Sequence, residues 1–465
     1  MAEKNSELRD KLFYIQKNGY AIIDANERSL CENYCEDYKS FLSIAKTERE
    51  AVNEAVKIAS SAGFLEYKKT KTPLKAGDRL YRNIRGKAVM FAVVGKKPLS
   101  EGAVFSVAHV DSPRLDLKQL PMFESDELCY LKTHYYGGIK KYQWTAVPLE
   151  LRGTVVKKDG EALHISVGAD KGDPQFVITD LLPHLGEEQM KKTMAEGITG
   201  EGLNILIGSI PQNDEGDDKV KLTVLSIINE KYGITEEDFV SADLCAVPAF
   251  EVRDIGFDRS LIGGYGHDDR VCAFSSLKAV TEIKIPEKTA VCVLTDREET
   301  GSEGVTGMQS EAFDSFIEDL CVAGGVRLRD CYENSVCISA DVSNAFDPNF
   351  PDVSEKRNNA KINYGVCLMK YTGSRGKSGS SDAGAELVAE MRKIFAGNGV
   401  VWQMSELGKV DKGGGGTVAK FTANRNIATI DAGVPVLSMH SPFEIVSKFD
   451  CYMTYKAVKA VFLQG

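Results

Sequence analysis

The chain has 465 residues, of which 43% are hydrophobic and 27% charged, the composition of an ordinary globular protein. Its formal net charge of −10 argues against a nucleic-acid-binding protein, which usually carries a basic surface. No apolar run approaches the roughly 18–20 residues of a membrane-spanning helix, and the N-terminus lacks the apolar segment of a signal peptide. The eleven cysteines include no Cys-x-x-Cys pair, and an unpaired set fits a reducing compartment. We therefore expect a cytoplasmic protein that binds neither nucleic acid nor membrane.

Hydrophobic periodicity predicts an alternation of strands and helices along most of the chain. In chain order, we expect a helix at 47–63, strands at 104–110 and 289–295 with a helix at 269–283 between them, a strand at 336–342, a helix at 381–395, a strand at 427–430 and a helix at 445–462. Such an alternation is typical of a mixed, mostly parallel sheet that is sandwiched by helices, which is the α/β class.

The segment 116–249 has a different pattern. Apolar residues on either side of Asp159-Gly160 predict a β-hairpin between about residues 147 and 168. Two further apolar runs, at Phe176 and Leu222, support a β-rich interpretation. We expect an inserted β-rich domain at 116–249 that divides a larger α/β domain into residues 1–115 and 250–465.

Two adjacent acids, Glu298 and Glu299, follow the strand expected at 289–295, and Gly301 comes just after them. Neighbouring side chains diverge, so one carboxylate could ligate a metal ion while the other acts as a general base. A solvated acidic turn is the commoner fate of a lone Glu-Glu pair. The Glu-Glu pair therefore indicates a metal site only if further candidate ligands are present as its partners elsewhere in the chain.

Such partners stand at the ends of other predicted elements. His109, Asp341 and His440 each end an apolar run, and α/β proteins build sites at the carboxyl edge of the sheet. Asp268 precedes the helix at 269–283, where the usual role of an aspartate is that of an N-cap. Asp111 could hold the imidazole of His109 in one tautomer.

Together these positions predict a metal site. Imidazole and carboxylate are ligand types that a pair of zinc ions accepts. The candidate ligands are His109, Asp268, Glu299, Asp341 and His440, with Glu298 remaining as a base. For His164 and His184, we expect hydrogen-bonded core positions instead.

Five motifs extend this set over nearly the whole chain: His109-Val-Asp-Ser-Pro-Arg114, His267-Asp-Asp-Arg270, Asp296-Arg-Glu-Glu-Thr-Gly-Ser302, Ser339-Ala-Asp341 and Met439-His-Ser441. In these motifs the chain resembles the aspartyl aminopeptidase family of dinuclear zinc exopeptidases. The resemblance implies a peptidase α/β domain that is interrupted by a β-rich dimerisation domain. It also implies self-association into a large closed homo-oligomer, a dodecamer.

The resemblance further implies a role for each metal-site residue. Two divalent ions would be bound, zinc in the first place, with cobalt or manganese as alternatives. Asp268 would bridge the two ions. His109 and Asp341 would complete the site of one ion, and Glu299 and His440 that of the other.

Three more residues receive roles in the reaction. The resemblance implies that Glu298 is the general base and that Asp111 orients His109. Lys370 is the candidate for contact with an acidic substrate side chain.

We therefore predict an aminopeptidase that hydrolyses the N-terminal residue from short peptides, with acidic N-terminal residues as the candidate preference. Two alternatives remain open. One is another metal-dependent amidohydrolase on the same fold, such as a carboxypeptidase or an N-acyl amino-acid deacylase. The other is a non-catalytic assembly protein that retains the fold.

Overall fold

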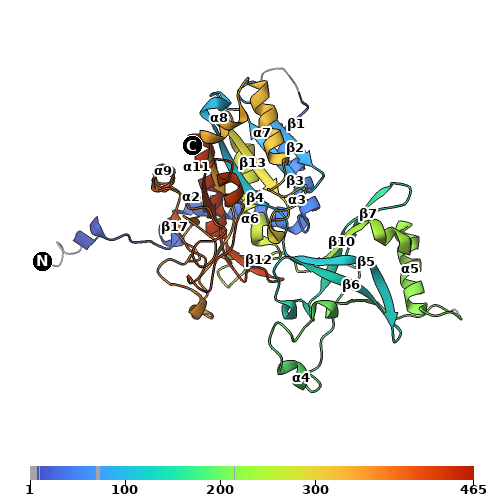
Figure 1. Ribbon diagram of the computed structural model, residues 1–465. Coiled ribbons are helices and arrows are strands. Elements are labelled where there is room, and N and C mark those ends of the chain that lie inside the picture. Colours follow the sequence, from blue (N-terminus) through green and yellow to red (C-terminus); the bar gives the residue numbers. More distant parts are fainter. Residues whose placement is uncertain (1–7, 10, 70–73, 214) are drawn as a thin grey trace.

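The computed structural model describes residues 8–9, 11–69, 74–213 and 215–465. Figure 1 shows a large body of helices and strands, from which a smaller, β-rich body projects to one side. The smaller body is formed by the cyan and green part of the chain, and the C-terminal end lies in the larger body.

A nine-stranded sheet forms the centre of the larger body. Its spatial order is β1-β2-β3-β13-β4-β14-β18-β16-β17. The four central strands, β13, β4, β14 and β18, are mutually parallel, whereas β3 and β16 pair antiparallel with them on either side. The expected mixed, mostly parallel sheet is therefore confirmed. The strands are β1 (Leu65–Glu66), β2 (Arg79–Ile84), β3 (Ala88–Val93), β4 (Ala103–His109), β13 (Thr289–Thr295), β14 (Val336–Ser339), β16 (Val366–Met369), β17 (Trp402–Met404) and β18 (Ala428–Gly433).

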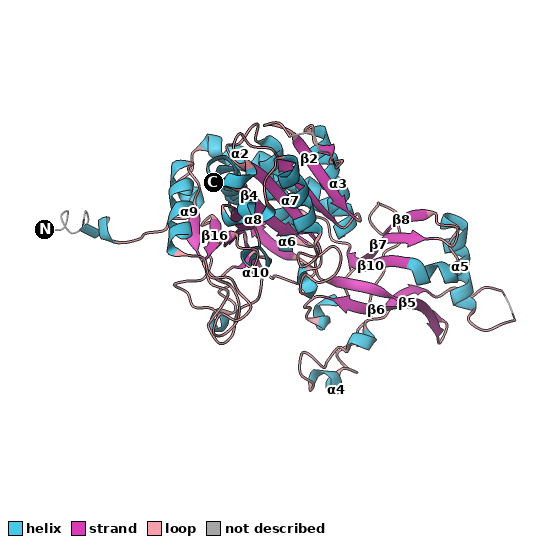
Figure 2. Cartoon of the chain, turned by 45° about the horizontal axis from the view of Figure 1, so that its top comes forward, coloured by secondary structure: helices cyan, strands magenta, loops and turns pink. Residues whose placement is uncertain are grey.

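Helices cover both faces of this sheet (Figure 2). Along β4, Val104 and Ala108 face one apolar cluster, which includes residues of α2, α3, α6, α9 and α11. Phe105 and Val107 face the opposite cluster, which includes residues of α7 and α8. This alternation explains why a strand that is buried on both faces appears in the sequence as a continuous apolar run. The helices are α2 (Ala25–Ile44), α3 (Glu48–Ser61), α4 (Glu187–Met190), α5 (Lys219–Tyr232), α6 (His267–Glu282), α7 (Ala312–Ala323), α8 (Leu328–Glu333), α9 (Ala385–Gly397), α10 (Ala419–Ala423) and α11 (Lys448–Gln464).

Short 3-10 helices connect several of these elements. They are η1 (Gly19–Ala21), η2 (Leu99–Glu101), η3 (Lys141–Trp144), η4 (Gly200–Gly202), η5 (Glu236–Ser241), η6 (Glu298–Thr300) and η7 (Pro351–Val353).

Most of the predicted elements are present, and four differ from expectation. The helix expected at 381–395 begins only at Ala385. The helix expected from Ile445 begins only at Lys448, because Glu444–Ser447 form strand β20 and Ser447 then caps α11 by accepting a hydrogen bond from the Phe449 amide. The strand expected at 336–342 ends at Ser339. The apolar run at Leu222 belongs to helix α5 rather than to a strand.

A five-stranded sheet lies beside the central one, in the order β11-β12-β20-β19-β15. It joins the segment after the insertion to the segment before α11, because β12 pairs with β20. Its strands are β11 (Arg253–Ile255), β12 (Leu261–Gly264), β15 (Ser343–Asn344), β19 (Pro435–Leu437) and β20 (Glu444–Ser447).

The segment 116–249, for which we expect an inserted domain and which we call the insertion, contains most of a six-stranded sheet in the order β8-β7-β10-β5-β6-β9. The predicted hairpin is present as the antiparallel pair β7 and β8. The apolar core of the insertion includes the fully buried Trp144. His164 and His184 are exposed rather than buried, so the core positions expected for them are wrong. The strands are β5 (Arg114–Ser125), β6 (Leu128–Tyr136), β7 (Leu149–Val156), β8 (Ala162–Val167), β9 (Ile205–Gly208) and β10 (Ala242–Pro248).

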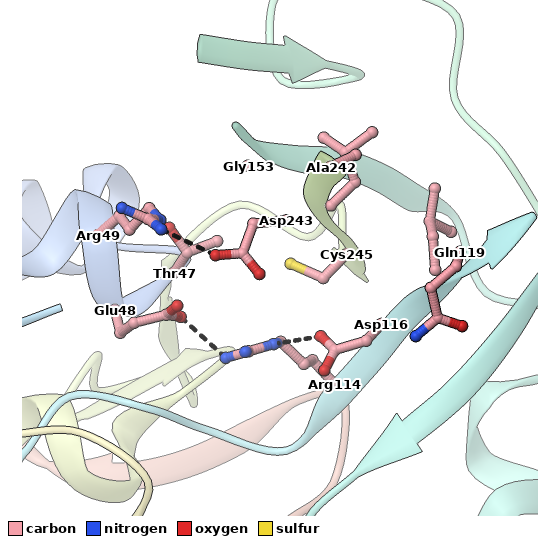
Figure 3. Close-up of a pocket in the computed structure, with 12 residues that line it drawn as sticks. Thr47, Glu48, Arg49, Arg114, Asp116, Gln119, Gly153, Ala242, Asp243 and Cys245 are labelled. Carbon is pink, nitrogen blue, oxygen red and sulfur yellow. Dashed lines mark hydrogen bonds and ion pairs between the residues drawn. The ribbon is translucent and has the colours of Figure 1, made fainter. Parts of the chain in front are cut away.

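Ion pairs connect the start of α3 to the insertion sheet. They surround a small pocket of about 210 Å³ in which the charged side chains already have partners (Figure 3). Arg49 lies 2.8 Å from Asp243, and Arg114 lies 2.9 Å from Glu48 and 2.7 Å from Asp116. We call this group the interdomain clasp. It fixes Arg114, at the start of β5, against the larger body.

All eleven cysteines are buried and unpaired. Within the described residues, no helix has both the length and the apolar character needed to cross a membrane.

Candidate metal centre

The five candidate ligands meet at one edge of the central sheet, although they come from five separate segments. His109 is the last residue of β4, and Asp268 lies in the first turn of α6. Glu299 belongs to η6, which follows β13. Asp341 stands two residues beyond β14, and His440 stands three residues beyond β19. The parallel order of β13, β4 and β14 brings the carboxyl ends of these strands together.

Asp268 occupies the middle of the group. Its Oδ1 lies 3.1 Å from Nε2 of His109, and its Oδ2 lies 3.1 Å from Nε2 of His440. One carboxylate therefore faces two imidazoles, one on each side. Its side chain is only 5% exposed, so the charged group has exchanged water for these two partners.

The remaining carboxylates lie near the two histidines. Glu299 Oε1 is 3.3 Å from Nε2 of His440. Asp341 Oδ1 is 3.9 Å from Nε2 of His109, and Oε2 of Glu298 is 4.0 Å from the same nitrogen. The structure thus brings all five candidate ligands and the candidate base into one cluster.

The cluster fits a divalent cation by its spacing and by its unsatisfied atoms. Ligand atoms about 2.1 Å from a tetrahedral zinc ion lie roughly 3.4 Å from one another, and the His–carboxylate separations here are 3.1–3.9 Å. Oε1 of Glu299 is buried without a hydrogen-bond donor among the described residues. Native proteins rarely leave such an atom unpartnered, and a bound ion would account for it.

The tautomers of both histidines are set by backbone carbonyls. Nδ1 of His109 lies 2.9 Å from the carbonyl oxygen of Asp111, and Nδ1 of His440 lies 2.8 Å from that of Gly138. A carbonyl oxygen can only accept, so each Nδ1 must carry the proton. When the imidazole is neutral, each Nε2 atom then presents a lone pair to the cluster, as metal ligation requires.

Asp111 supports the centre through its side chain as well. Its buried carboxylate accepts the backbone N–H groups of Glu298 and Glu299, at 3.1 and 3.2 Å, and the hydroxyl of Tyr136 at 2.7 Å. Its Oδ1 also lies 3.3 Å from Nδ1 of His109. One side chain therefore connects His109 to the segment that carries both glutamates.

Two further acids near the centre were not among the sequence-based candidates. Oδ2 of Asp269 accepts the backbone N–H of His109 at 3.2 Å, and Asp269 groups with His109 and Asp341 as a possible ligand set. Glu444 accepts the backbone N–H groups of His440 and Asp268, at 2.7 and 3.0 Å. The only sequence signal for them was proximity to a candidate ligand.

Burial and charge shift the pKa values in this region. Burial, together with the charges of Asp111 and Asp268, raises the pKa of Glu298 to about 7, although His109 opposes this change. Burial also disfavours ionisation of Asp268, but hydrogen bonds from His109 and His440 outweigh it and lower the pKa of this group.

A cleft of about 450 Å³ opens onto the centre. Glu298, Glu299 and His440 line it, together with residues 416–417 and Lys420 of α10. Among the described lining residues, Lys420 is the only lysine or arginine, and no ion pair is formed by its ammonium group. Lys370 is exposed just beyond β16 and is not among the residues that line this cleft.

The chain is similar to known proteins over most of its length. The model of the aminopeptidase I zinc metalloprotease family (M18) matches residues 41–462. A probable M18 family aminopeptidase 1 of Clostridium acetobutylicum is 50% identical, over 91% of this chain and 93% of the relative.

Solved structures show the same fold. The crystal structure of an M18 family aminopeptidase from Thermotoga maritima has a TM-score of 0.93 at 42% identity, covering 97% of this chain and 100% of the other. The S. cerevisiae mApe1 dodecamer has a TM-score of 0.75 at 20% identity, over 94% of this chain and 97% of the other. The chain belongs to the M18 family of aminopeptidases, which are zinc metalloproteases that hydrolyse peptide bonds.

Proposed function

We propose that this aminopeptidase uses two divalent metal ions, zinc in the first place, to release the N-terminal residue of short peptides. The observation that carries the proposal is the position of Asp268, whose two oxygens each face Nε2 of a different histidine at 3.1 Å. A bridging carboxylate has this environment, with one ion on each side.

The other ligands divide naturally between the two ions. Asp341 lies 3.9 Å from Nε2 of His109, and Glu299 lies 3.3 Å from Nε2 of His440. The carboxylate of Asp269 already accepts the amide of His109 through one oxygen. We therefore assign Asp269 to the support of His109 rather than to a primary ligand position.

Glu298 is the proposed general base. Its side chain is 18% exposed, lines the cleft and has a pKa raised to about 7. When bound, the ions would polarise the scissile carbonyl and lower the pKa of water, which is the chemistry that such centres supply. Glu298 would take the proton from water and deliver it to the leaving amine. Asp111 would hold Glu298 in place through the backbone amide.

Metal removal tests the proposal directly. Dialysis against a chelator should abolish hydrolysis of an aminoacyl anilide, and the addition of zinc, cobalt or manganese should restore it. Titration should show two equivalents per chain. A metal-stripped protein with full activity, or one that is saturated by a single equivalent, would contradict the proposal. N-acetylated substrates should remain intact, because an aminopeptidase requires a free α-amine.

The cleft also supports a preference for acidic N-terminal residues. Lys420 lines it without an ion-pair partner among the described residues, so its charge is available to a substrate carboxylate. Lys370 is the second candidate, from the sequence. The variants Lys420→Met and Lys370→Met, assayed with glutamyl and leucyl anilides, distinguish them. Loss of glutamyl activity alone identifies the contact, and equal glutamyl and leucyl rates in the wild type would refute the preference.

We further propose that the insertion, residues 116–249, is a domain through which the protein forms a large closed homo-oligomer, a dodecamer. The segment around α4 supports this proposal, because its apolar side chains are 49–70% exposed in the single chain and α4 lies at the edge of the smaller body (Figure 1). These residues are Leu181, Leu182, Leu185, Met190 and Met194. The fold shared with the mApe1 dodecamer is consistent with such an assembly.

Light scattering tests the assembly. A closed oligomer should have a mass many times that of the 50.9 kDa chain. A monomer or simple dimer at micromolar concentration would contradict it.

A further inference from the structure

Three consecutive residues of the insertion contact the metal centre from outside the larger body. Tyr136 is the last residue of β6, and Gly137 and Gly138 follow it. We call residues 136–138 the strap. None of them can ligate a metal ion through a side-chain nitrogen or carboxylate, yet each one contacts a residue of the proposed centre.

Tyr136 acts on the side of the centre that holds His109. Its buried hydroxyl donates a hydrogen bond of 2.7 Å to Oδ2 of Asp111. The same carboxylate accepts the amides of Glu298 and Glu299, and its Oδ1 lies 3.3 Å from Nδ1 of His109. The tyrosine hydroxyl therefore completes the set of donors that fixes the orientation of Asp111.

Gly138 acts on the opposite side. Its carbonyl oxygen accepts the Nδ1 proton of His440 at 2.8 Å, which leaves Nε2 free to face Asp268 and Glu299. Because the acceptor is a backbone oxygen, this hydrogen bond forms only when the strap is held at a fixed distance from His440.

Gly137 permits this close approach. Its backbone has φ = +73°, a conformation that residues other than glycine rarely adopt. A Cβ atom at this position would lie 3.2 Å from Cβ and 3.4 Å from Oε2 of Glu299. The strap thus packs directly against the glutamate that faces His440.

The strap is anchored by the interdomain clasp. The guanidinium of Arg114 lies 4.3 Å from the centroid of the Tyr136 ring and is paired with Glu48 of α3 and with Asp116 (Figure 3). A cation on an aromatic face is held electrostatically in a buried setting. The tyrosine ring is therefore fixed between the clasp and Asp111.

We infer that the strap is a positioning element of the metal centre, so that the insertion completes the site for the metal ions in addition to any part it has in assembly. This inference rests on the proposed two-ion centre. Tyr136 orients His109 through Asp111, while the Gly138 carbonyl orients His440. Outer partners of this kind typically change metal affinity about 10–100-fold when they are removed.

Metal binding by Tyr136→Phe tests the inference, with Tyr135→Phe as the matched control. Tyr135 is the preceding residue of the same strand, is 42% exposed, and therefore lies on its opposite face. Zinc affinity, measured by competition with a chromophoric chelator, should fall about 10–100-fold in Tyr136→Phe and stay at the wild-type value in Tyr135→Phe. The absorption spectrum of the cobalt-substituted protein should change only in the former.

Gly137→Ala provides a second, independent variant. The added methyl group should displace the strap from Glu299 and weaken metal binding at least as much. If either variant bound zinc like the wild type, or lost only thermal stability in the metal-free state, the inference would be overturned. A wild-type protein that binds no zinc would instead contradict the proposed function, so the two failures are distinguishable.

Discussion

Replacement of Asp111 by asparagine should lower kcat/KM, and replacement by alanine should lower it further. The carboxylate accepts the backbone N–H of Glu298 through Oδ1 and that of Glu299 through Oδ2. An asparagine amide has one oxygen and one NH2 group. In either orientation, one of the two backbone donors meets another donor, whereas alanine leaves both donors without an acceptor.

The magnitude follows from the number of hydrogen bonds that are lost. A hydrogen bond to a charged group contributes about 1.5–3 kcal/mol. Asp111 is completely buried, so water does not replace the lost acceptor. Asparagine, with one backbone bond lost, should therefore reduce kcat/KM about 10–100-fold, and alanine, with both backbone bonds and that of the Tyr136 hydroxyl lost, about 10³–10⁶-fold, if the whole cost falls on the transition state.

The assay is kcat/KM for an aminoacyl anilide at saturating zinc, accompanied by the zinc affinity of each variant. Saturating zinc separates the orientation of Glu298 from the loss of metal, because occupancy is then equal. If Asp111→Asn had wild-type kcat/KM under these conditions, or if asparagine and alanine had the same effect, the count of hydrogen bonds would not explain the role of Asp111.

Three other predictions follow from the same structure. Glu298→Gln should slow turnover about 10²–10⁴-fold with two zinc ions still bound, whereas Glu299→Gln should also lower the zinc content; equal zinc content with full activity in Glu298→Gln would show that the roles are misassigned. Burial disfavours ionisation of Asp243, but hydrogen bonds from Arg49 and Lys87 lower its pKa from 3.8 to about 2. The clasp should therefore stabilise the protein above about pH 4 and lose this contribution as the pH falls towards 2, so the Tm of Asp243→Asn should depend less steeply on pH in that window; an unchanged slope would count against the clasp. Finally, Leu185→Asp should reduce the oligomer mass in light scattering and the exposed polar control Lys192→Ala should not, while an intact oligomer in Leu185→Asp would exclude this segment from the interface.

The parts of the fold that could be predicted are those in which one physical requirement dominates a continuous segment. A strand buried on both faces must be apolar throughout, so β13 was predicted with its observed bounds, Thr289–Thr295. Element ends were less predictable. Nothing local indicates that the backbone of Glu444–Ser447 pairs with β12 and β19 before α11 begins, because that choice depends on strands distant in sequence.

The residues of the candidate site also differ in how well the sequence predicts them. The residues that face the ions, such as Asp268 and His440, carry chemistry that is recognisable from residue type and from position at the end of a predicted element. Tyr136 does not, because a tyrosine in an alternating strand is an ordinary observation. Its role depends on a hydroxyl that reaches Asp111 across two parts of the fold, which no periodicity reveals.

The position of the strap also bears on why an insertion would be retained inside a catalytic domain. The proposed metal centre requires its ligands in place before binding, and an imidazole that rotates freely presents the wrong nitrogen for part of the time. The larger body fixes His109 through the carbonyl of Asp111, but His440 has 35% of its side chain exposed and relies on the Gly138 carbonyl of the insertion. The more exposed histidine is thus the one whose tautomer depends on the insertion. A chain from which the insertion had been deleted would keep the ligand residues and lose the group that orients one of them.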